Sequence, residues 1–154
     1  MCVYHKTLLQ CPPDKVWNSL QSRITFQHIT SPMAKFLPFS PEEPLPERWQ
    51  EGATVLCRPY ALGFWPLGVH TLHFERIDPA RREIQTREHS TSVKKWDHLI
   101  SVHEGPTPET CLYSDEVEID SGWQTVITAG MAHLFYLFRQ WRWRAFAKKL
   151  ARSG

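Results

Sequence analysis

Three ionisable side chains, Glu88, His98 and Asp115, lie at positions where the surrounding residues alternate between apolar and polar. Residues 95–104 and 110–120 both show this alternation, which is typical of β-strands, and His98 and Asp115 fall on the more apolar face. A carboxylate beside an imidazole forms a charge-assisted hydrogen bond that holds the tautomer of the ring. These residues therefore suit either ligand anchoring or proton transfer.

The strand pairing predicted from the turns brings the ionisable residues close together. Folding neighbouring strands back about their turns places His98 opposite Asp115 on one side and opposite Thr86 on the other. Glu88 then lies one row away, and His70 lies one row nearer the end of its strand. Facing side chains have Cβ atoms about 5 Å apart, so a direct hydrogen bond between His98 and Asp115 is expected.

The rest of the predicted face is apolar. A few converging polar groups in an apolar wall are the usual make-up of a small-molecule site, so this face is the predicted ligand-binding surface. An equally weighted interpretation is a buried pair of His98 and Asp115 that only holds the strand register. The apolar members of the predicted surface are Leu72, Phe74, Trp96, Ile100, Tyr113 and Val117.

Two chemical alternatives use the same side chains. General acid–base catalysis on a polyketide-like carbonyl substrate would employ His98 and Asp115 with Glu88, but no nucleophile elbow or phosphate loop accompanies them. Metal binding would add His70, but no two of these residues have the i, i+4 spacing of a helical metal site. We therefore expect neither a metal nor a cofactor, and assign no catalytic residue.

One long helix, predicted over residues 123–150, supplies the partner surface for these strands. A helical period of 3.6 residues defines an apolar stripe, which is predicted to face the sheet. Three of its members, Met131, Leu134 and Phe138, are therefore added to the predicted ligand-binding residues. The complete stripe is Trp123, Ile127, Gly130, Met131, Leu134, Phe138, Trp141 and Ala145.

A second stripe on the same helix is aromatic and basic and is predicted to face outward. Such a face can contact a membrane surface, a partner protein or the second subunit of a homodimer. We favour packing against the N-terminal segment or the proline-rich loop instead, and both a monomer and a homodimer stay open. Its members are Tyr136, Arg139, Trp143, Phe146 and Leu150.

The remaining elements predict an α+β fold, with a curved antiparallel sheet of six or seven strands around the long helix. Two short helices follow the first strand, and the proline-rich segment 31–50 is predicted to be an ordered loop. Trp65, in the turn at residues 63–68, is expected to cover the ligand. Strands are predicted at 3–10, 54–62, 67–78, 82–89, 95–104 and 110–120, helices at 13–20 and 22–28, and the last hairpin turn at 105–108.

Composition restricts the function classes. The 154 residues, 42% of them apolar, predict one domain over 1–154 with a substantial core. The net charge is only +2, and the six basic residues after Ser121 form one tail without a nucleic-acid-binding motif, so no nucleic acid is expected. Four widely spaced cysteines are expected to be free thiols. No signal peptide or spanning segment is recognised, which predicts a cytoplasmic protein.

Several segments resemble the SRPBCC superfamily, which includes START domains and polyketide cyclases, and in particular its largely uncharacterised bacterial ligand-binding branch. The resemblance covers nearly the whole chain. It implies a helix-grip fold with a cavity between sheet and helix that holds a small apolar or amphipathic molecule without a cofactor. The segments are FQHITSPM (26–33), LPERW (45–49), WDH (96–98), SDEV (114–117) and residues 136–144.

Overall fold

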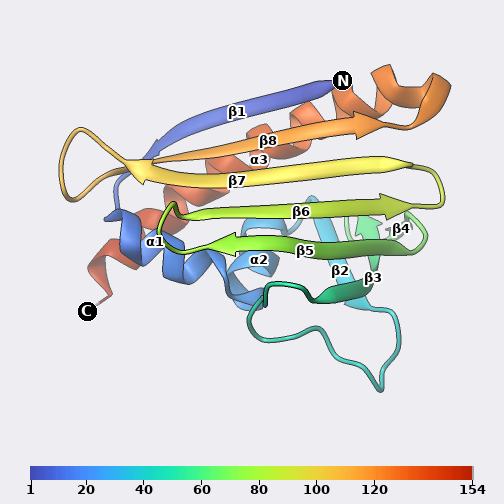
Figure 1. The fold of residues 1–154 in the computed structure, drawn as a ribbon, viewed down its shortest axis with the longest axis horizontal. Helices are drawn as coiled ribbons and strands as arrows, with labels where there is room; N and C mark the ends of the chain where they lie inside the picture. Colours follow the sequence, from blue (N-terminus) through green and yellow to red (C-terminus); the bar gives the residue numbers. More distant parts are fainter. Residues whose placement is uncertain (154) are drawn as a thin grey trace.

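The computed structural model describes residues 1–153, in which a curved antiparallel sheet wraps around one long helix (Figure 1). This helix, α3, spans Thr125–Arg152 and follows a short 3-10 turn, η1, at Gly122–Gln124. The α+β helix-grip architecture predicted from the sequence is confirmed. Within residues 1–153, no helix has the length and apolar character needed to cross a bilayer.

The sheet contains eight strands, of which seven follow the order β1-β8-β7-β6-β5-β3-β2 and β4 pairs with β3. Strands β5 to β8 form a meander joined by short turns, and β1 returns to lie beside β8. The strands are β1 (Cys2–Leu9), β2 (Ala34–Pro38), β3 (Thr54–Ala61), β4 (Trp65–Pro66), β5 (His70–Asp78), β6 (Glu83–Ser90), β7 (Lys95–Glu104) and β8 (Cys111–Asp120).

Two short helices, α1 and α2, follow β1. Helix α1 spans Pro13–Leu20, as predicted, because Pro13 suits the first helical turn, where its missing N–H is not needed. Helix α2 spans Arg23–Thr30 and packs its buried face against α3. The main core lies between these helices, the sheet and the C-terminal half of α3.

Two strands lie in segments predicted to be irregular. β2 falls in the proline-rich segment, and β4 falls in the turn predicted at residues 63–68, which raises the strand count from the predicted six or seven to eight. β2 pairs only with β3, so it lies at a sheet edge. Pro38, which has no N–H, is tolerated at an edge because it does not interrupt hydrogen bonding between two neighbouring strands. The proline content therefore excluded a central strand but not an edge strand.

Helix α3 faces the sheet with the opposite side from the predicted one. Trp123 is 87% exposed and Trp141 is 55% exposed, whereas Trp143 is fully buried and Arg139 is 4% exposed. The aromatic and basic stripe predicted to face outward thus packs inward. Among residues predicted to bind ligand, Met131 and Leu134 are exposed on the outer side of the helix.

The orientation of α3 follows from the buried charge on the sheet. Both sides of α3 carry apolar residues, so helical periodicity alone does not distinguish them. The sheet contributes a buried carboxylate, Asp115, which needs a cation, and only the stripe with Arg139 provides one. The same side carries Ala129, Ala132 and Ala147, whose small side chains allow the helix to approach the sheet closely.

The pairing of the last two strands also differs from the prediction. His98 lies opposite Val117, and Asp115 lies opposite Ile100, a shift of two residues. The connection runs from 105 to 110 rather than over the four predicted residues, because Thr110 bonds back to Thr107 and ends the turn. A shift of two keeps every side chain on its predicted face.

Candidate functional site

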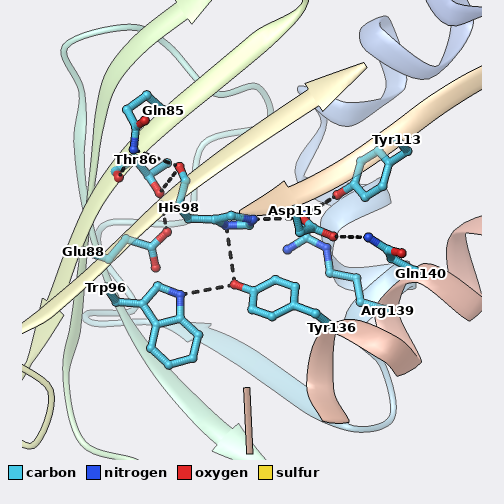
Figure 2. Close-up of polar contacts among 10 residues, drawn as sticks. All are labelled: Gln85, Thr86, Glu88, Trp96, His98, Tyr113, Asp115, Tyr136, Arg139 and Gln140. Carbon is cyan, nitrogen blue, oxygen red and sulfur yellow. Dashed lines mark hydrogen bonds and ion pairs between the residues drawn. The ribbon is translucent and has the colours of Figure 1, made fainter. Parts of the chain in front are cut away.

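Asp115 is the centre of a buried polar network between the sheet and α3 (Figure 2). Its side chain is fully buried, and Oδ1 accepts hydrogen bonds from His98 Nε2 at 2.8 Å and Tyr113 Oη at 3.0 Å. Gln140 Nε2 donates to Oδ2 at 3.2 Å, and Arg139 Nη2 lies 3.8 Å from Oδ1. His98 and Asp115 therefore contact each other as predicted, although as diagonal neighbours and not as facing residues.

His98 connects Asp115 to a second group of aromatic residues. Nε2 of the ring contacts Asp115, and Tyr136 Oη lies 3.5 Å from the other ring nitrogen, Nδ1. Tyr136 in turn accepts a hydrogen bond of 3.2 Å from Trp96 Nε1. Both nitrogens of the His98 ring are thus engaged with protein groups, one of them at the limit of a hydrogen bond.

Glu88 forms a second acidic centre on β6. His70 Nε2 lies 2.7 Å from Oε2, and Thr86 Oγ1 donates to Oε1 at 2.5 Å. The Glu88 side chain is 9% exposed and that of His70 is 14% exposed. The predicted proximity of His70 and Glu88 is thus present, and the pair lies nearer the surface than the pair of His98 and Asp115.

Burial and neighbouring charges act in opposite directions on the two carboxylates. Burial on its own would raise the pKa of Asp115, but Arg139 and the hydrogen bond from His98 outweigh it, so the pKa lies below the ordinary value of 3.8. Burial would also raise the pKa of Glu88, and His70 with Thr86 lowers it below 4.5. Both groups are therefore anionic at neutral pH.

These lowered pKa values predict a loss of stability in acid. A carboxylate with a lower pKa in the folded state contributes stability that is complete above its unfolded value and disappears as the pH falls through its folded value. The free energy of unfolding should therefore decline below about pH 4.5, by at most about 1.4 kcal/mol per pH unit for each carboxylate. Urea unfolding between pH 6 and pH 3 measures this decline.

A matched pair of variants isolates the contribution of Asp115 to acid sensitivity. Asp115→Asn should reduce the pH dependence, whereas Glu116→Gln, which changes an exposed carboxylate on the same strand, should leave it nearly unchanged. Equal pH dependence in all three proteins would contradict the lowered pKa of Asp115.

Arg139 provides the positive charge of the network. Burial alone would lower its pKa, but Tyr113 and Asp115 outweigh that effect and raise it, so the guanidinium stays charged. Nη2 donates to Tyr113 Oη at 3.0 Å, whereas the buried Nε has no hydrogen-bond partner among residues 1–153. A buried N–H without an acceptor costs roughly 1–3 kcal/mol, so this position favours an additional acceptor.

A small cavity of about 40 Å³, partly open to the surface, lies beside this network. Its polar lining comes from Thr86, Glu88, His98 and Arg139, and the rest of its wall is apolar. This volume holds one or a few water molecules but is far below that of a drug-sized site. The apolar lining residues are Leu20, Phe26, Ile29, Trp49, Leu72, Phe74, Ile84 and Ile100.

Part of the cavity wall comes from residues that the predicted site did not include. Trp49, from the proline-rich segment, stacks on Phe74 with ring centroids 5.1 Å apart and packs edge-on against Phe26. Trp65, predicted to cover the ligand, is exposed and does not line the cavity. Trp49 and Phe26 therefore contribute to the cavity wall, and Trp65 does not.

The structure brings together most of the predicted sheet residues. Glu88, His98, Leu72, Phe74 and Ile100 line the cavity. The other predicted sheet residues do not line the cavity. Tyr113 and Asp115 belong to the polar network, and Trp96 contacts Tyr136. Val117 belongs to a second core cluster, and His70 forms a hydrogen bond with Glu88. From the helix, Phe138 is only partly buried and contacts Trp141, and neither Met131 nor Leu134 lines the cavity.

The predicted site missed Tyr136, Arg139 and Gln140, which contact His98 and Asp115 from the helix. The missed signal was electrostatic. A carboxylate predicted on a buried face requires a cation, and the predicted inner stripe of the helix contained no charged residue. Among residues 1–153, no group of three or more His, Cys, Asp or Glu side chains has an arrangement suited to a metal ion.

Comparisons with solved structures agree on one fold. A protein of Chromobacterium violaceum matches with a TM-score of 0.73 and 11% identity over 95% of this chain and 96% of that one. A START superfamily protein from Mycobacterium smegmatis matches with a TM-score of 0.70 and 12% identity over 97% and 98%. The Zhui aromatase/cyclase of a Streptomyces species matches with a TM-score of 0.71 and 15% identity over 99% and 96%.

These likenesses establish that the chain has the same helix-grip fold as a START superfamily protein and an aromatase/cyclase. No family model matches the sequence, and no curated protein matches it. At identities of 11–15%, the solved structures define the fold and not the ligand or the chemistry.

Proposed function

We propose that the chain binds a small apolar or amphipathic molecule, non-covalently and without a cofactor, between the sheet and α3. The observation that carries this proposal is the lined cavity, in which Glu88, His98 and Arg139 converge inside an apolar wall. Such convergence is the usual composition of a small-molecule site. The START-like and cyclase neighbours support small-molecule binding in general terms.

The charges around the cavity favour a neutral polar group on the ligand. Arg139 Nε offers a hydrogen-bond donor, while its charge is already balanced by Asp115. Glu88 offers an acceptor, and its negative charge would repel a second carboxylate. A hydroxyl or a phenol, which can accept from Arg139 and donate to Glu88, satisfies both.

Binding requires the cavity to enlarge, and Trp49 is the side chain best placed to allow this. It lies in an irregular segment, residues 39–53, which is held to the body by a few backbone hydrogen bonds such as Trp49 N to Gln21 O at 3.0 Å. The other walls belong to helices and strands. Moving the Trp49 ring off Phe74 would extend the cavity without breaking the sheet.

The alternative acid–base role of His98 has less support. Its Nε2 faces Asp115 and its Nδ1 faces Tyr136, so neither nitrogen is directed at the cavity without a competing partner. A general base needs a nitrogen within hydrogen-bond reach of the substrate proton. Ligand binding does not require a free ring nitrogen on His98.

Calorimetric titration with 1-naphthol and with naphthalene-1-carboxylate tests the proposal. The wild-type chain should bind 1-naphthol, and it should bind the carboxylate at least tenfold more weakly because of Glu88. Trp49→Ala should bind 1-naphthol more tightly, since the ring no longer has to be displaced. Trp65→Ala, which removes an exposed tryptophan outside the cavity, serves as the matched control and should bind like the wild type.

Two results would contradict the proposal. In the first, neither the wild-type chain nor Trp49→Ala binds 1-naphthol. In the second, both tryptophan variants change affinity equally, which would place binding outside the cavity.

A further inference from the structure

The outer side of α3 carries an exposed apolar stripe. Its large side chains lie opposite the buried face of the helix, and tryptophans stand at both ends. We call this set the outer stripe, and its members are Trp123, which lies in η1 just before α3, and Val126, Ile127, Met131, Leu134, Leu137 and Trp141 of α3.

The outer stripe is too long to be a chance exposure. Within α3, from Val126 to Trp141, it covers 15 residue steps, or about 22 Å of helix at 1.5 Å per residue, and Trp123 extends it into η1. Single exposed apolar residues are common on proteins, but a continuous patch of this kind marks a contact surface. No acidic side chain interrupts it, because the sequence contains none after Asp120.

The same side of the helix becomes basic beyond Trp141. Arg144, Lys148 and Arg152 follow at intervals of four residues, so they continue one line along the helix, and all three are exposed. This line extends the apolar surface with positive charge. The surface that fits it is apolar in one region and anionic in another.

A groove next to these residues adds a second feature. It is a shallow depression, open to solvent, with a volume of about 500 Å³ between the end of β1 and the C-terminal half of α3. Leu8 and Trp141 supply its apolar lining, and Arg144 and Lys148 supply its cations. An apolar wall next to two cations matches the junction between an acyl chain and a phosphate headgroup.

We propose that this side of α3 docks onto an anionic lipid bilayer. Helices that lie in the membrane interface insert an apolar face, often with tryptophan, and hold anionic headgroups with lysine and arginine. The outer stripe supplies the first feature, and Arg144 with Lys148 supplies the second. The helix lies along the surface, since no helix in residues 1–153 is suited to span a bilayer.

A second copy of the chain fits the charges less well. Parallel pairing of two outer stripes would place Arg144, Lys148 and Arg152 of both copies side by side. Antiparallel pairing would leave these cations beside the uncharged stretch near Trp123. An anionic bilayer meets the stripe and the cations at the same time.

Co-sedimentation of the full chain with phospholipid vesicles tests this docking. Binding to vesicles of phosphatidylcholine and phosphatidylglycerol at 3:1 should exceed binding to pure phosphatidylcholine at least tenfold, and it should weaken in 0.5 M NaCl. Leu134→Glu should reduce binding at least tenfold. The double variant Arg144→Gln, Lys148→Gln should remove the preference for phosphatidylglycerol.

Phe64→Glu is the matched control. Phe64 is 70% exposed, but it lies in the β3–β4 turn, outside α3, so its replacement should leave vesicle binding unchanged. Equal losses with Phe64→Glu and Leu134→Glu would overturn the proposal. A protein that binds neither kind of vesicle would also overturn it. So would a protein that sediments as a dimer and becomes a monomer in the Leu134→Glu variant.

Discussion

Replacing Trp143 with alanine should destabilise the fold by about 3–5 kcal/mol, the usual cost of removing a buried aromatic side chain. The Trp143 side chain is fully buried, 5.2 Å between ring centroids from Tyr113 and 5.6 Å from Phe146. Its loss leaves a void between the sheet and α3. Thermal unfolding should show a decrease in Tm of about 10 °C for a chain of this size.

Two further variants test whether the destabilisation by Trp143→Ala comes from the loss of a buried side chain. Trp141→Ala, only two positions away but on the exposed side, should change stability by less than about 0.5 kcal/mol. Trp143→Phe should cost much less than Trp143→Ala, because the indole Nε1 has no hydrogen-bond partner among residues 1–153. Equal effects of Trp141→Ala and Trp143→Ala would contradict the observed orientation of α3.

Asp115→Asn should also cost about 3–5 kcal/mol, because it leaves the buried Arg139 guanidinium without its counter-charge. Asparagine has nearly the shape of aspartate, so the loss reports charge and hydrogen bonding more than packing. Its amide group would in addition face donors from His98, Tyr113 and Gln140. Urea unfolding at pH 7 measures the difference.

A double-mutant cycle tests whether this loss of stability comes from the interaction between Asp115 and Arg139. Arg139→Met alone should destabilise the chain for the converse reason, and the double variant should be more stable than the sum of the single effects predicts. Glu116→Gln, an exposed carboxylate on the same strand, is the control and should be nearly neutral. Strict additivity of Asp115→Asn and Arg139→Met would show that the two charges do not interact.

The inward face of the sheet could be predicted because strand alternation has a period of two. Glu88, His98 and Asp115 lie on the predicted face even though the β7–β8 pairing is shifted, since a shift of two residues preserves the face. Thr86 lies opposite His98 as predicted. The shift itself depended on hydrogen bonds of Thr110 inside the turn, which residue types alone do not reveal.

The orientation of α3 could not be predicted from apolar periodicity, because both of its sides are apolar. The deciding residues were polar: Arg139 and Gln140 satisfy Asp115, and Tyr136 reaches His98. Trp49 was missed for a different reason. The proline-rich segment has no periodicity from which to infer the direction of a side chain.

Native mass spectrometry of the chain purified from the cells that produce it tests the proposed ligand binding most directly. The account predicts one discrete bound mass, present in the wild type and in Trp65→Ala, and reduced in Glu88→Gln. A chain that carries no bound molecule, and whose Trp49→Ala variant likewise captures none from a panel of small aromatic alcohols, would contradict it. The polar network around Asp115 would then be a structural element of the core and not part of a binding site.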